Sequence, residues 1–401
     1  MKFHLNLINA VCSCVKQIFD ENKYADKALE KLLKSDKRWG ARDRAFIAEN
    51  TYDIVRYWRL ITTVTGLENR DLNEQNMYTL FGAWHVLKGI ELPRWTEFGN
   101  VDAKKILHTY NQLKTQRKII QSIPDWLDEM AMNELGKFWN KELEALNQTA
   151  PLVIRANTLK TSKNELRKSF IEKKIETESV SGVKDALLLK ERQNIFITDE
   201  FKNGLFEVQD SGSQLVADFL QVEPGMKVVD ACAGAGGKSL HLSALLENKG
   251  KITSLDTEQW KLDELKKRAR RAGACNIETR LIEGSKTIKK LQNTADRLLL
   301  DVPCSGLGVL RRNPDAKWKL KPDFIFRVMQ QQKEILENYS KILKSGGKMV
   351  YATCSILPRE NTLQVQEFLN THPEFILEEE KKIFTSETGF DGFYMARIRK
   401  V

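Results

Sequence analysis

The chain has 401 residues and a formal net charge of +10, with 41% hydrophobic and 29% charged residues. This length allows two or three domains, and no apolar run approaches the roughly 20 residues of a membrane-spanning helix. The positive charge favours a polyanionic partner such as nucleic acid, although many soluble proteins are basic without one. The six cysteines show no zinc-binding spacing, and a disulfide framework is not expected in a long, non-secreted chain. We therefore expect a cytoplasmic protein that binds no metal and no membrane.

Residues 1–122 predict a helical domain. Apolar residues in the first 20 positions recur at helical spacing, and Asn6 and Asn9 interrupt the apolar run. This pattern predicts an amphipathic helix and not a secretory leader. Residues 41–61 and 75–89 show the same spacing. Basic side chains gather in and just before the first of these two helices, and they form either a solvated helix face or an RNA-facing surface. They are Lys34, Lys37, Arg38, Arg42, Arg44, Arg56 and Arg59.

Residues 123–205 predict a small α+β module. A boundary is expected at Pro124, which ends one helix and begins the next. Strands are predicted at 152–159, 185–190 and 194–198, with a helix at 162–174.

From residue 206 to 401 the pattern becomes an alternation of strands and helices. This order predicts a Rossmann-like α/β domain, whose mainly parallel sheet has helices on both faces. In such sheets ligands bind outside the carboxyl ends of the strands. The predicted strands are 227–232, 251–256, 277–284, 297–303 and 348–355, and the helices are 237–248, 258–273 and 324–343.

The first of these strands runs into a turn of small residues between Asp230 and Lys238. Small residues let a ligand approach the backbone, and the helix that follows offers free N–H groups. The turn is not a P-loop, because that pattern would need glycine where Cys232 stands. Asp256 ends the next strand, roughly 20 residues later, where a carboxylate either binds a ribose diol or only caps the following helix. Together the two features favour an adenosine-bearing ligand.

Two cysteines follow apolar runs in near-matching settings, Cys304 within Asp301–Gly306 and Cys354 within Tyr351–Ser355. Neighbouring strands lie about 4.8 Å apart, so thiols at their ends can flank one substrate atom. Two thiols at one site indicate covalent catalysis, whereas a single cysteine is more often a buried structural residue. The basic residues that come next either pair with phosphate or are solvated, and they are Arg311, Arg312 and Lys317.

These motifs resemble those of the RsmB/Sun (Nop/Sun) RNA cytosine-C5 methyltransferases. The stretch DACAGAGGK resembles the family's S-adenosyl-L-methionine (SAM) loop, DVPCSGLGVLRRNPDAKW its Pro-Cys motif and MVYATCSILPRENTLQVQEFL its Thr-Cys motif. FEVQDSGSQLVA and GFDGFYMARI resemble the segments that open and close the domain, and the match covers residues 124–401. The helical N-terminus resembles a NusB-like RNA-binding domain.

The resemblance implies methylation of C5 of cytosine in RNA, with SAM as cofactor and a covalent bond from cysteine to C6. It makes Cys354 the nucleophile and Cys304 the residue that assists release, while Asp301 contacts the base edge and Lys238 orients the site. The residues alone leave the roles of the two thiols open. DNA cytosine methyltransferases use the cysteine of a Pro-Cys motif as their nucleophile, and that pattern would make Cys304 the nucleophile. The implied cofactor-binding residues are Cys232, Ala233, Gly234, Ala235, Gly236, Gly237, Lys238, Asp256, Ser285 and Asp301.

Two positions depart from the family pattern. Ala235 stands where the family usually has proline, which should loosen the loop but keep its N–H donors. Ser285 replaces an aspartate, so a neutral hydroxyl remains to accept a hydrogen bond from the adenine amino group. The expected substrate is small-subunit (16S) rRNA, with tRNA as the second choice. A non-catalytic RNA-binding ribosome assembly factor is the alternative from another class.

Overall fold

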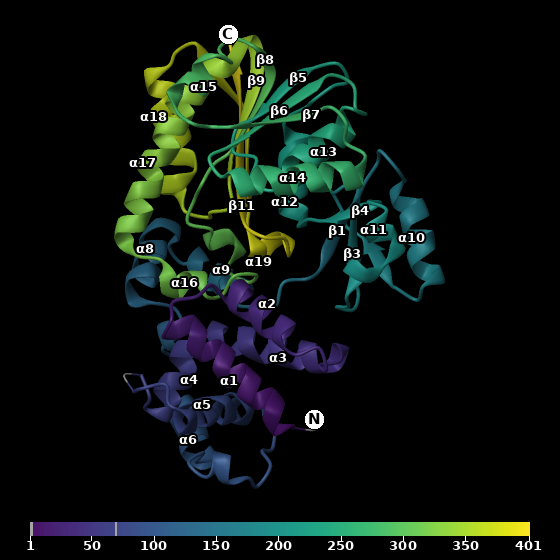
Figure 1. Ribbon diagram of the computed structural model, residues 1–401. Helices are drawn as coiled ribbons and strands as arrows, with labels where there is room; N and C mark the ends of the chain where they lie inside the picture. Colours follow the sequence, from purple (N-terminus) through teal and green to yellow (C-terminus); the bar gives the residue numbers. More distant parts are fainter. Residues whose placement is uncertain (1–2, 69) are drawn as a thin grey trace. The chain divides into compact units, whose positions relative to one another are not determined.

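The computed structural model describes residues 3–68 and 70–401 (Figure 1). The chain forms two compact units. The first unit holds the N-terminal residues up to Gln148 together with Leu310–Pro322, and the second holds Thr149–Val309 and Asp323–Val401. The chain therefore leaves the second unit just after the Cys304 motif, adds a short segment to the first unit and returns. The domain boundaries expected near residues 122 and 205 stay predictions; the second would subdivide the second unit, whereas the first lies inside the first unit, which continues to Gln148.

The first unit is built from helices, as the sequence predicts. Its core consists of apolar side chains that recur at helical spacing. They include Ile8, Val11, Ile47, Ile61 and Phe81, which are all fully buried. The helices are α1 (Leu5–Phe19), α2 (Ala25–Ser35), α3 (Ala41–Arg56), α4 (Trp58–Thr65), α5 (Glu74–Leu87), η1 (Thr96–Phe98), α6 (Ala103–Leu113), α7 (Arg117–Ile120), α8 (Asp125–Leu135) and α9 (Phe138–Leu146), joined by α16 (Ala316–Lys319) of the inserted segment.

Leu310–Pro322, the inserted segment, is held by buried polar contacts. The Asp315 carboxylate accepts the backbone N–H of Ala25 at 3.0 Å. The Lys317 ammonium donates to the carbonyl of Arg56 at 2.8 Å and to Asn147 Oδ1 at 3.2 Å. Lys317 is 1% exposed, so both sequence expectations for it, phosphate pairing and solvation, are wrong. Burial, with the charge of Arg56 adding to it, lowers the pKa of Lys317 well below its ordinary value.

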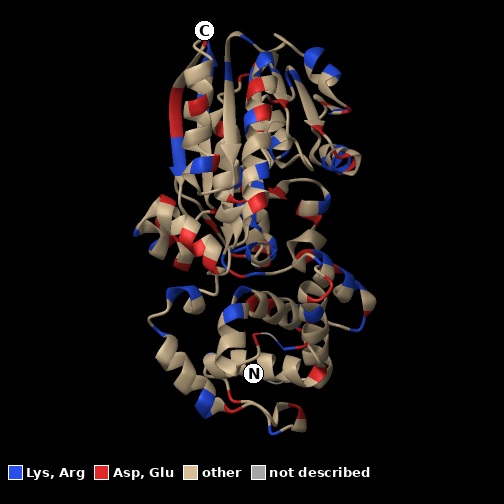
Figure 2. Cartoon of the chain, turned by 90° about the vertical axis from the view of Figure 1, so that its left-hand side faces the viewer, with Lys and Arg blue, Asp and Glu red and all other residues tan. Residues whose placement is uncertain are grey.

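Only some of the basic residues that were expected to form a surface of the helical domain are exposed. Arg56 is buried, Arg44 and Arg59 are partly buried, and all three donate to backbone carbonyls of the first unit. The others of that group are exposed, and they are Lys34, Lys37, Arg38 and Arg42. Figure 2 shows basic and acidic residues interspersed along the helices on the face in view.

The small module of the second unit is an antiparallel sheet with strand order β2-β3-β1-β4. Its elements are β1 (Val153–Ala156), α10 (Lys163–Glu172), β2 (Thr177–Ser179), β3 (Ala186–Leu189), η2 (Ile195–Ile197), α11 (Asp199–Lys202) and β4 (Phe206–Val208). The strand predicted at 194–198 is wrong, because the Asn194 side chain accepts the N–H of Phe196 and curls the segment into η2.

The main sheet has the order β10-β11-β9-β8-β5-β6-β7, with the five strands from β9 to β7 parallel and β10 and β11 antiparallel at one edge. The Rossmann-like expectation is thus confirmed. The strands are β5 (Lys227–Asp230), β6 (Lys251–Asp256), β7 (Ile277–Leu281), β8 (Ala295–Asp301), β9 (Leu343–Thr353), β10 (Phe375–Ile383) and β11 (Phe393–Lys400).

Helices cover both faces of this sheet (Figure 1). Leu298 and Leu300 of β8 pack with α17 and α18, whereas Leu299 between them packs with α12 and α13, as the alternation of side chains along a strand requires. The helices are α12 (Ser211–Phe219), α13 (Gly237–Leu245), α14 (Gln259–Ala272), α15 (Ser285–Lys289), α17 (Pro322–Tyr339), α18 (Thr362–Thr371) and α19 (Thr385–Thr388), with single turns η3 (Leu307–Val309), η4 (Ser340–Ile342) and η5 (Pro358–Glu360).

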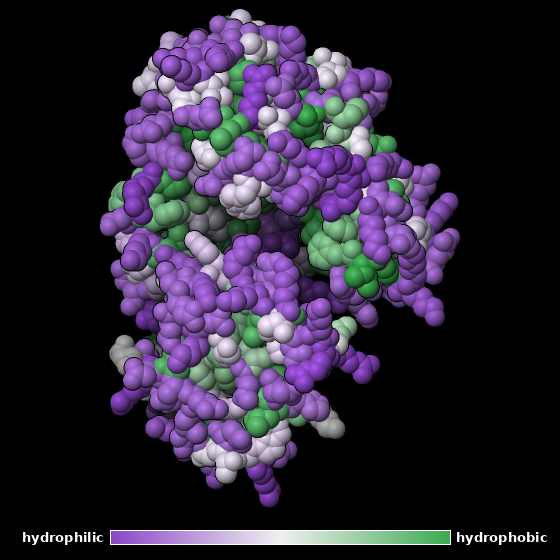
Figure 3. All heavy atoms as spheres, viewed as in Figure 1, coloured by the Kyte–Doolittle hydropathy of each residue, from purple (hydrophilic) through white to green (hydrophobic). Residues whose placement is uncertain are grey.

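The space-filling view shows hydrophilic residues over most of the face in view, with apolar residues in separate patches (Figure 3). In the described part of the chain, none of the helices combines the length and apolar character needed to cross a membrane.

Candidate active site

A tight turn links β5 to α13 at the carboxyl edge of the main sheet. Gly236 has φ +85°, and a Cβ there would come within 2.4 Å of Leu265 Cγ. Gly234 is also left-handed, with φ +53°, and its N–H donates to Asp256 Oδ2 at 2.9 Å. Glycine is needed at Gly236 because both the backbone angle and the neighbouring side chain exclude a Cβ.

A cavity of about 420 Å³ opens beside this turn, entirely within the second unit. That volume falls in the usual range of small-molecule sites, about 300–1,000 Å³. Three of the predicted cofactor residues line it, namely Cys232, Asp256 and Ser285. The cavity therefore lies where an adenosine-bearing ligand is expected, at the ends of β5, β6 and β7.

Asp256 lies both at the cavity and at the start of the following helix, so ribose binding by its carboxylate stays a prediction. Asp256 lines the cavity, and its Oδ1 also accepts the N–H of Glu258 at 2.9 Å where α14 begins. The other predicted loop residues, Ala233 to Lys238, lie next to Cys232 in the chain but are not among the residues that line the cavity. Asp301 likewise does not line it.

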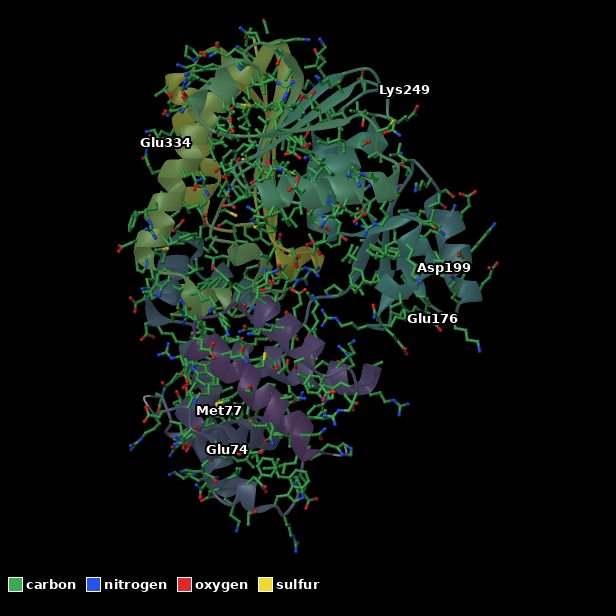
Figure 4. All side chains as sticks on the ribbon, viewed as in Figure 1. Glu74, Met77, Glu176, Asp199, Lys249 and Glu334 are labelled. Atoms are coloured by element: carbon green, nitrogen blue, oxygen red, sulfur yellow. The ribbon has the colours of Figure 1, made fainter. Side chains whose placement is uncertain are left out.

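Sequence reasoning missed the opposite wall of the cavity, which comes from α17. Its contributors recur at helical spacing and so share one face of the helix: Gln331, Glu334, Ile335, Asn338 and Tyr339. Glu334 is labelled on α17 in Figure 4. The spacing itself was a usable signal, but it also fits a helix that merely covers the sheet.

The two cysteines of the matching motifs do meet. β8 and β9 are parallel neighbours with Asp301 opposite Ala352, so the loops after them leave the sheet side by side. The two sulfur atoms, Cys304 Sγ and Cys354 Sγ, lie 3.3 Å apart, and both residues are partly buried.

The two thiols differ in their surroundings. The pKa of Cys304 is raised well above its ordinary value, first by its hydrogen bond with Cys354, then by burial and by the charges of Cys354 and Glu360. Cys304 therefore carries its proton at neutral pH. The charge of Cys354 is also felt by Lys238, which places a cation near that sulfur.

Lys238 and Asp301 form a close ion pair, with Nζ 2.6 Å from Oδ2. Burial opposes the charge of Lys238, yet its attraction to Asp301 and the hydrogen bond to it outweigh burial and raise the lysine pKa. The structure thus joins the four predicted catalytic residues in two pairs, Cys304 with Cys354 and Lys238 with Asp301.

Comparison with known proteins agrees with this architecture. The model of the 16S rRNA methyltransferase RsmB/F family matches residues 217–399, and that of the ferredoxin-like domain of RsmF/B-like methyltransferases matches residues 123–196. The probable ribosomal RNA small subunit methyltransferase B of Synechocystis is 30% identical, over 96% of this chain and 97% of that protein.

Solved structures show the same fold. The crystal structure of PH0851 aligns over all of both chains with a TM-score of 0.84 and 24% identity. A methyltransferase homolog from Pyrococcus horikoshii aligns over 98% of its own length and 71% of this chain, with a TM-score of 0.64 and 26% identity.

Fold, cavity and comparisons together define a SAM-dependent methyltransferase that acts on RNA. More narrowly, the chain belongs to the RsmB/F (Sun) family of ribosomal RNA small subunit methyltransferases.

Proposed function

We propose that this enzyme methylates C5 of cytosine in RNA through a covalent bond between Cys354 and C6 of the base. The observation that carries the proposal is the pair of thiols 3.3 Å apart at the carboxyl ends of two adjacent strands. C5 of cytosine is a weak nucleophile, and a thiolate that adds to C6 turns it into the carbon of an enamine. Covalent catalysis in this way divides one difficult step into two easier ones.

In the first step the Cys354 thiolate forms the S–C6 bond, and the electron pair of the C5–C6 double bond becomes available at C5. SAM bound in the cavity would supply the methyl group to C5, and the electron pair of its methyl–sulfur bond would leave with S-adenosylhomocysteine. A base then takes the C5 proton, the double bond re-forms, and the electron pair of the S–C6 bond returns to the Cys354 sulfur.

In this proposal Cys304 assists the release. Two of the causes that raise its pKa are the hydrogen bond with Cys354 and the charge of Cys354. Both disappear once Cys354 is bonded to the base, because the sulfur then carries neither a proton nor a charge. Cys304 therefore gives up its own proton more readily at the stage when a base is needed.

Asp301 and Lys238 bind and orient the base in this proposal. A carboxylate accepts hydrogen bonds from the amino group of cytosine, and Lys238 Nζ holds Asp301 Oδ2 at 2.6 Å. The target cytosine must reach the thiols, so it lies in a loop or is flipped out of a helix.

The cofactor is assigned to the cavity beside the β5–α13 turn. Asp256 binds the ribose hydroxyls and Ser285 accepts from the adenine amino group, and Cys232 lines the same cavity. The face of α17 forms the second wall.

Small-subunit rRNA is the substrate that the name of the Synechocystis relative supports. Bisulfite sequencing of RNA from a strain that lacks the gene tests this, because 5-methylcytosine resists conversion. We expect one cytosine of the small-subunit rRNA to become convertible. A newly convertible cytosine in tRNA would change the substrate, and no change in any RNA would overturn the C5 assignment.

A further inference from the structure

A buried carboxylate lies directly behind the two cysteines. Glu360, at the end of η5, is fully buried, and it is not among the residues that line the cavity. Oε1 of Glu360 accepts the hydroxyls of Ser305 and Ser355, each at 2.5 Å. Oε2 accepts the backbone N–H of Ser305 at 2.7 Å and the side-chain amide of Gln332 at 3.2 Å.

Two of the partners of Glu360 are the serines that follow the two cysteines. Ser305 follows Cys304 directly and Ser355 follows Cys354 directly. The two serine hydroxyls also lie 3.1 Å from each other. One carboxylate therefore binds both cysteine loops, which are 50 residues apart in the chain.

The backbone of Glu360 is itself fixed to β9, the strand that leads into Cys354. The Tyr351 hydroxyl donates to the Glu360 carbonyl at 2.7 Å. The next residue, Asn361, accepts from Thr353 Oγ1 at 2.5 Å and donates to the Ser355 carbonyl at 2.9 Å. These contacts hold the carboxylate in place independently of the Cys304 loop.

A buried carboxylate is costly unless donors surround it, and hydrogen bonds to a charged acceptor are about twice as strong as neutral ones. The charge of Glu360 thus draws the donors of both loops to one point. We propose that Glu360 is a positioning residue that fixes the distance between the two catalytic thiols. This inference rests on the proposed two-cysteine chemistry and deepens it.

The same charge has a second effect. It is one of the causes that raise the pKa of Cys304, after the hydrogen bond with Cys354, burial and the charge of Cys354. Glu360 therefore also helps to keep the Cys304 thiol protonated before the adduct forms.

The activity test compares Glu360→Gln with Glu367→Gln, a matched change at an exposed glutamate of α18 that is paired with Lys333. Gln keeps the shape of Glu360 but turns an N–H₂ group toward donors. We expect kcat to fall about 100-fold, the cost of a misplacement of about 1 Å, while the KM for SAM stays unchanged. Glu367→Gln should leave both constants as they are.

A second measurement uses neither RNA nor SAM, so it stands even if the proposed function fails. In a Cys354→Ser background, the pH midpoint for alkylation of Cys304 by iodoacetamide is followed by mass spectrometry, with and without Glu360→Gln. We expect the midpoint to move to lower pH when the carboxylate charge is removed. A role in folding alone would leave the midpoint where it was.

If Glu360→Gln does not fold, the double variant Ser305→Ala/Ser355→Ala takes its place. This variant should fold, because the carboxylate keeps its hydrogen bonds from the Ser305 N–H and from Gln332. The double variant should also have a lower kcat, with the KM for SAM unchanged. The inference is overturned if kcat is unaffected in the folded variant, or if the Cys304 midpoint does not move.

Discussion

Asp230, the last residue of β5, shows how strongly burial shapes the chemistry of single residues at this edge of the sheet. It is 1% exposed, and its Oδ2 accepts the Ser239 hydroxyl at 2.6 Å. Burial raises the pKa of Asp230 to about 7, and the nearby charge of Asp301 acts in the same direction. Close to neutral pH, therefore, one carboxyl of this edge is half protonated.

This shift predicts a specific pH dependence of stability. The pKa of Asp230 is higher in the folded state than in the unfolded chain, where it is about 3.9. The protonated carboxyl thus contributes stability that is fully present below about pH 4 and is lost as the pH rises through about 7, at up to about 1.4 kcal/mol per pH unit. Asp230→Asn removes this dependence.

Urea unfolding of both proteins at pH 5 and pH 8 checks the prediction. The free energy of unfolding of Asp230→Asn minus that of the wild type should be larger at pH 8 than at pH 5. An equal difference at the two pH values would mean that Asp230 is ionised throughout.

At the scale of residues, the sequence was informative where chemistry-bearing side chains follow apolar strands. Cys304, Cys354 and Asp256 could be placed at strand ends in this way. Glu360 could not, because a charged residue in a proline-containing turn ordinarily marks solvent. Its burial depends on donors from a loop far away in the chain, although the spacing of Ser355 and Glu360 within one motif was a signal that could have been followed.

Among the elements, the turn before α13 depends most on one residue type. Gly236 combines φ +85° with the contact to Leu265, whereas a Cβ at Gly237 would meet nothing within 4 Å. Gly236→Ala should lower the free energy of unfolding by about 1–3 kcal/mol, through backbone strain and overpacking. Gly237→Ala should be neutral or slightly stabilising, because alanine favours helix by about 1 kcal/mol over glycine.

Thermal unfolding of the two variants measures this contrast directly. Equal stability of Gly236→Ala and Gly237→Ala would show that the turn accommodates a side chain at either position.

Element prediction succeeded where the periodicity was long and failed where it was short. The five parallel strands and the helices α13, α14 and α17 were expected from their apolar spacing, whereas α12, α18 and β10 were not predicted. The segment 194–198 was wrongly predicted as a strand, since three consecutive apolar residues fit a strand as well as a turn. There Ile195 alone is buried, while Phe196 and Ile197 are exposed.

For the whole molecule, the unexpected feature is the inserted segment Leu310–Pro322, which leaves the catalytic unit just after the Cys304 motif. Its cations were expected to face solvent or phosphate, and no local pattern reveals that Asp315 and Lys317 are buried. Their contacts lie more than 150 residues away in the chain. Long-range packing of this kind leaves no periodic trace in the sequence.

The inserted segment yields a prediction for the stability of the first unit. Asp315→Ala leaves the buried N–H of Ala25, at the start of α2, without its acceptor, which costs about 1–3 kcal/mol. Asp315→Asn keeps an oxygen at that position and should cost less. Urea unfolding gives the free energies, and equal losses in the two variants would show that the hydrogen bond to Ala25 is not what holds the segment.

The central claim, that Cys354 bonds to the base and Cys304 releases it, is tested most directly by the covalent adduct itself. Single-cysteine variants are incubated with substrate RNA and SAM and run on denaturing gels. Cys304→Ala should accumulate a protein–RNA adduct, because the methylated base is not released, and Cys354→Ala should form none and transfer no methyl group. An adduct with Cys354→Ala and none with Cys304→Ala would contradict the assignment and exchange the roles of the two thiols.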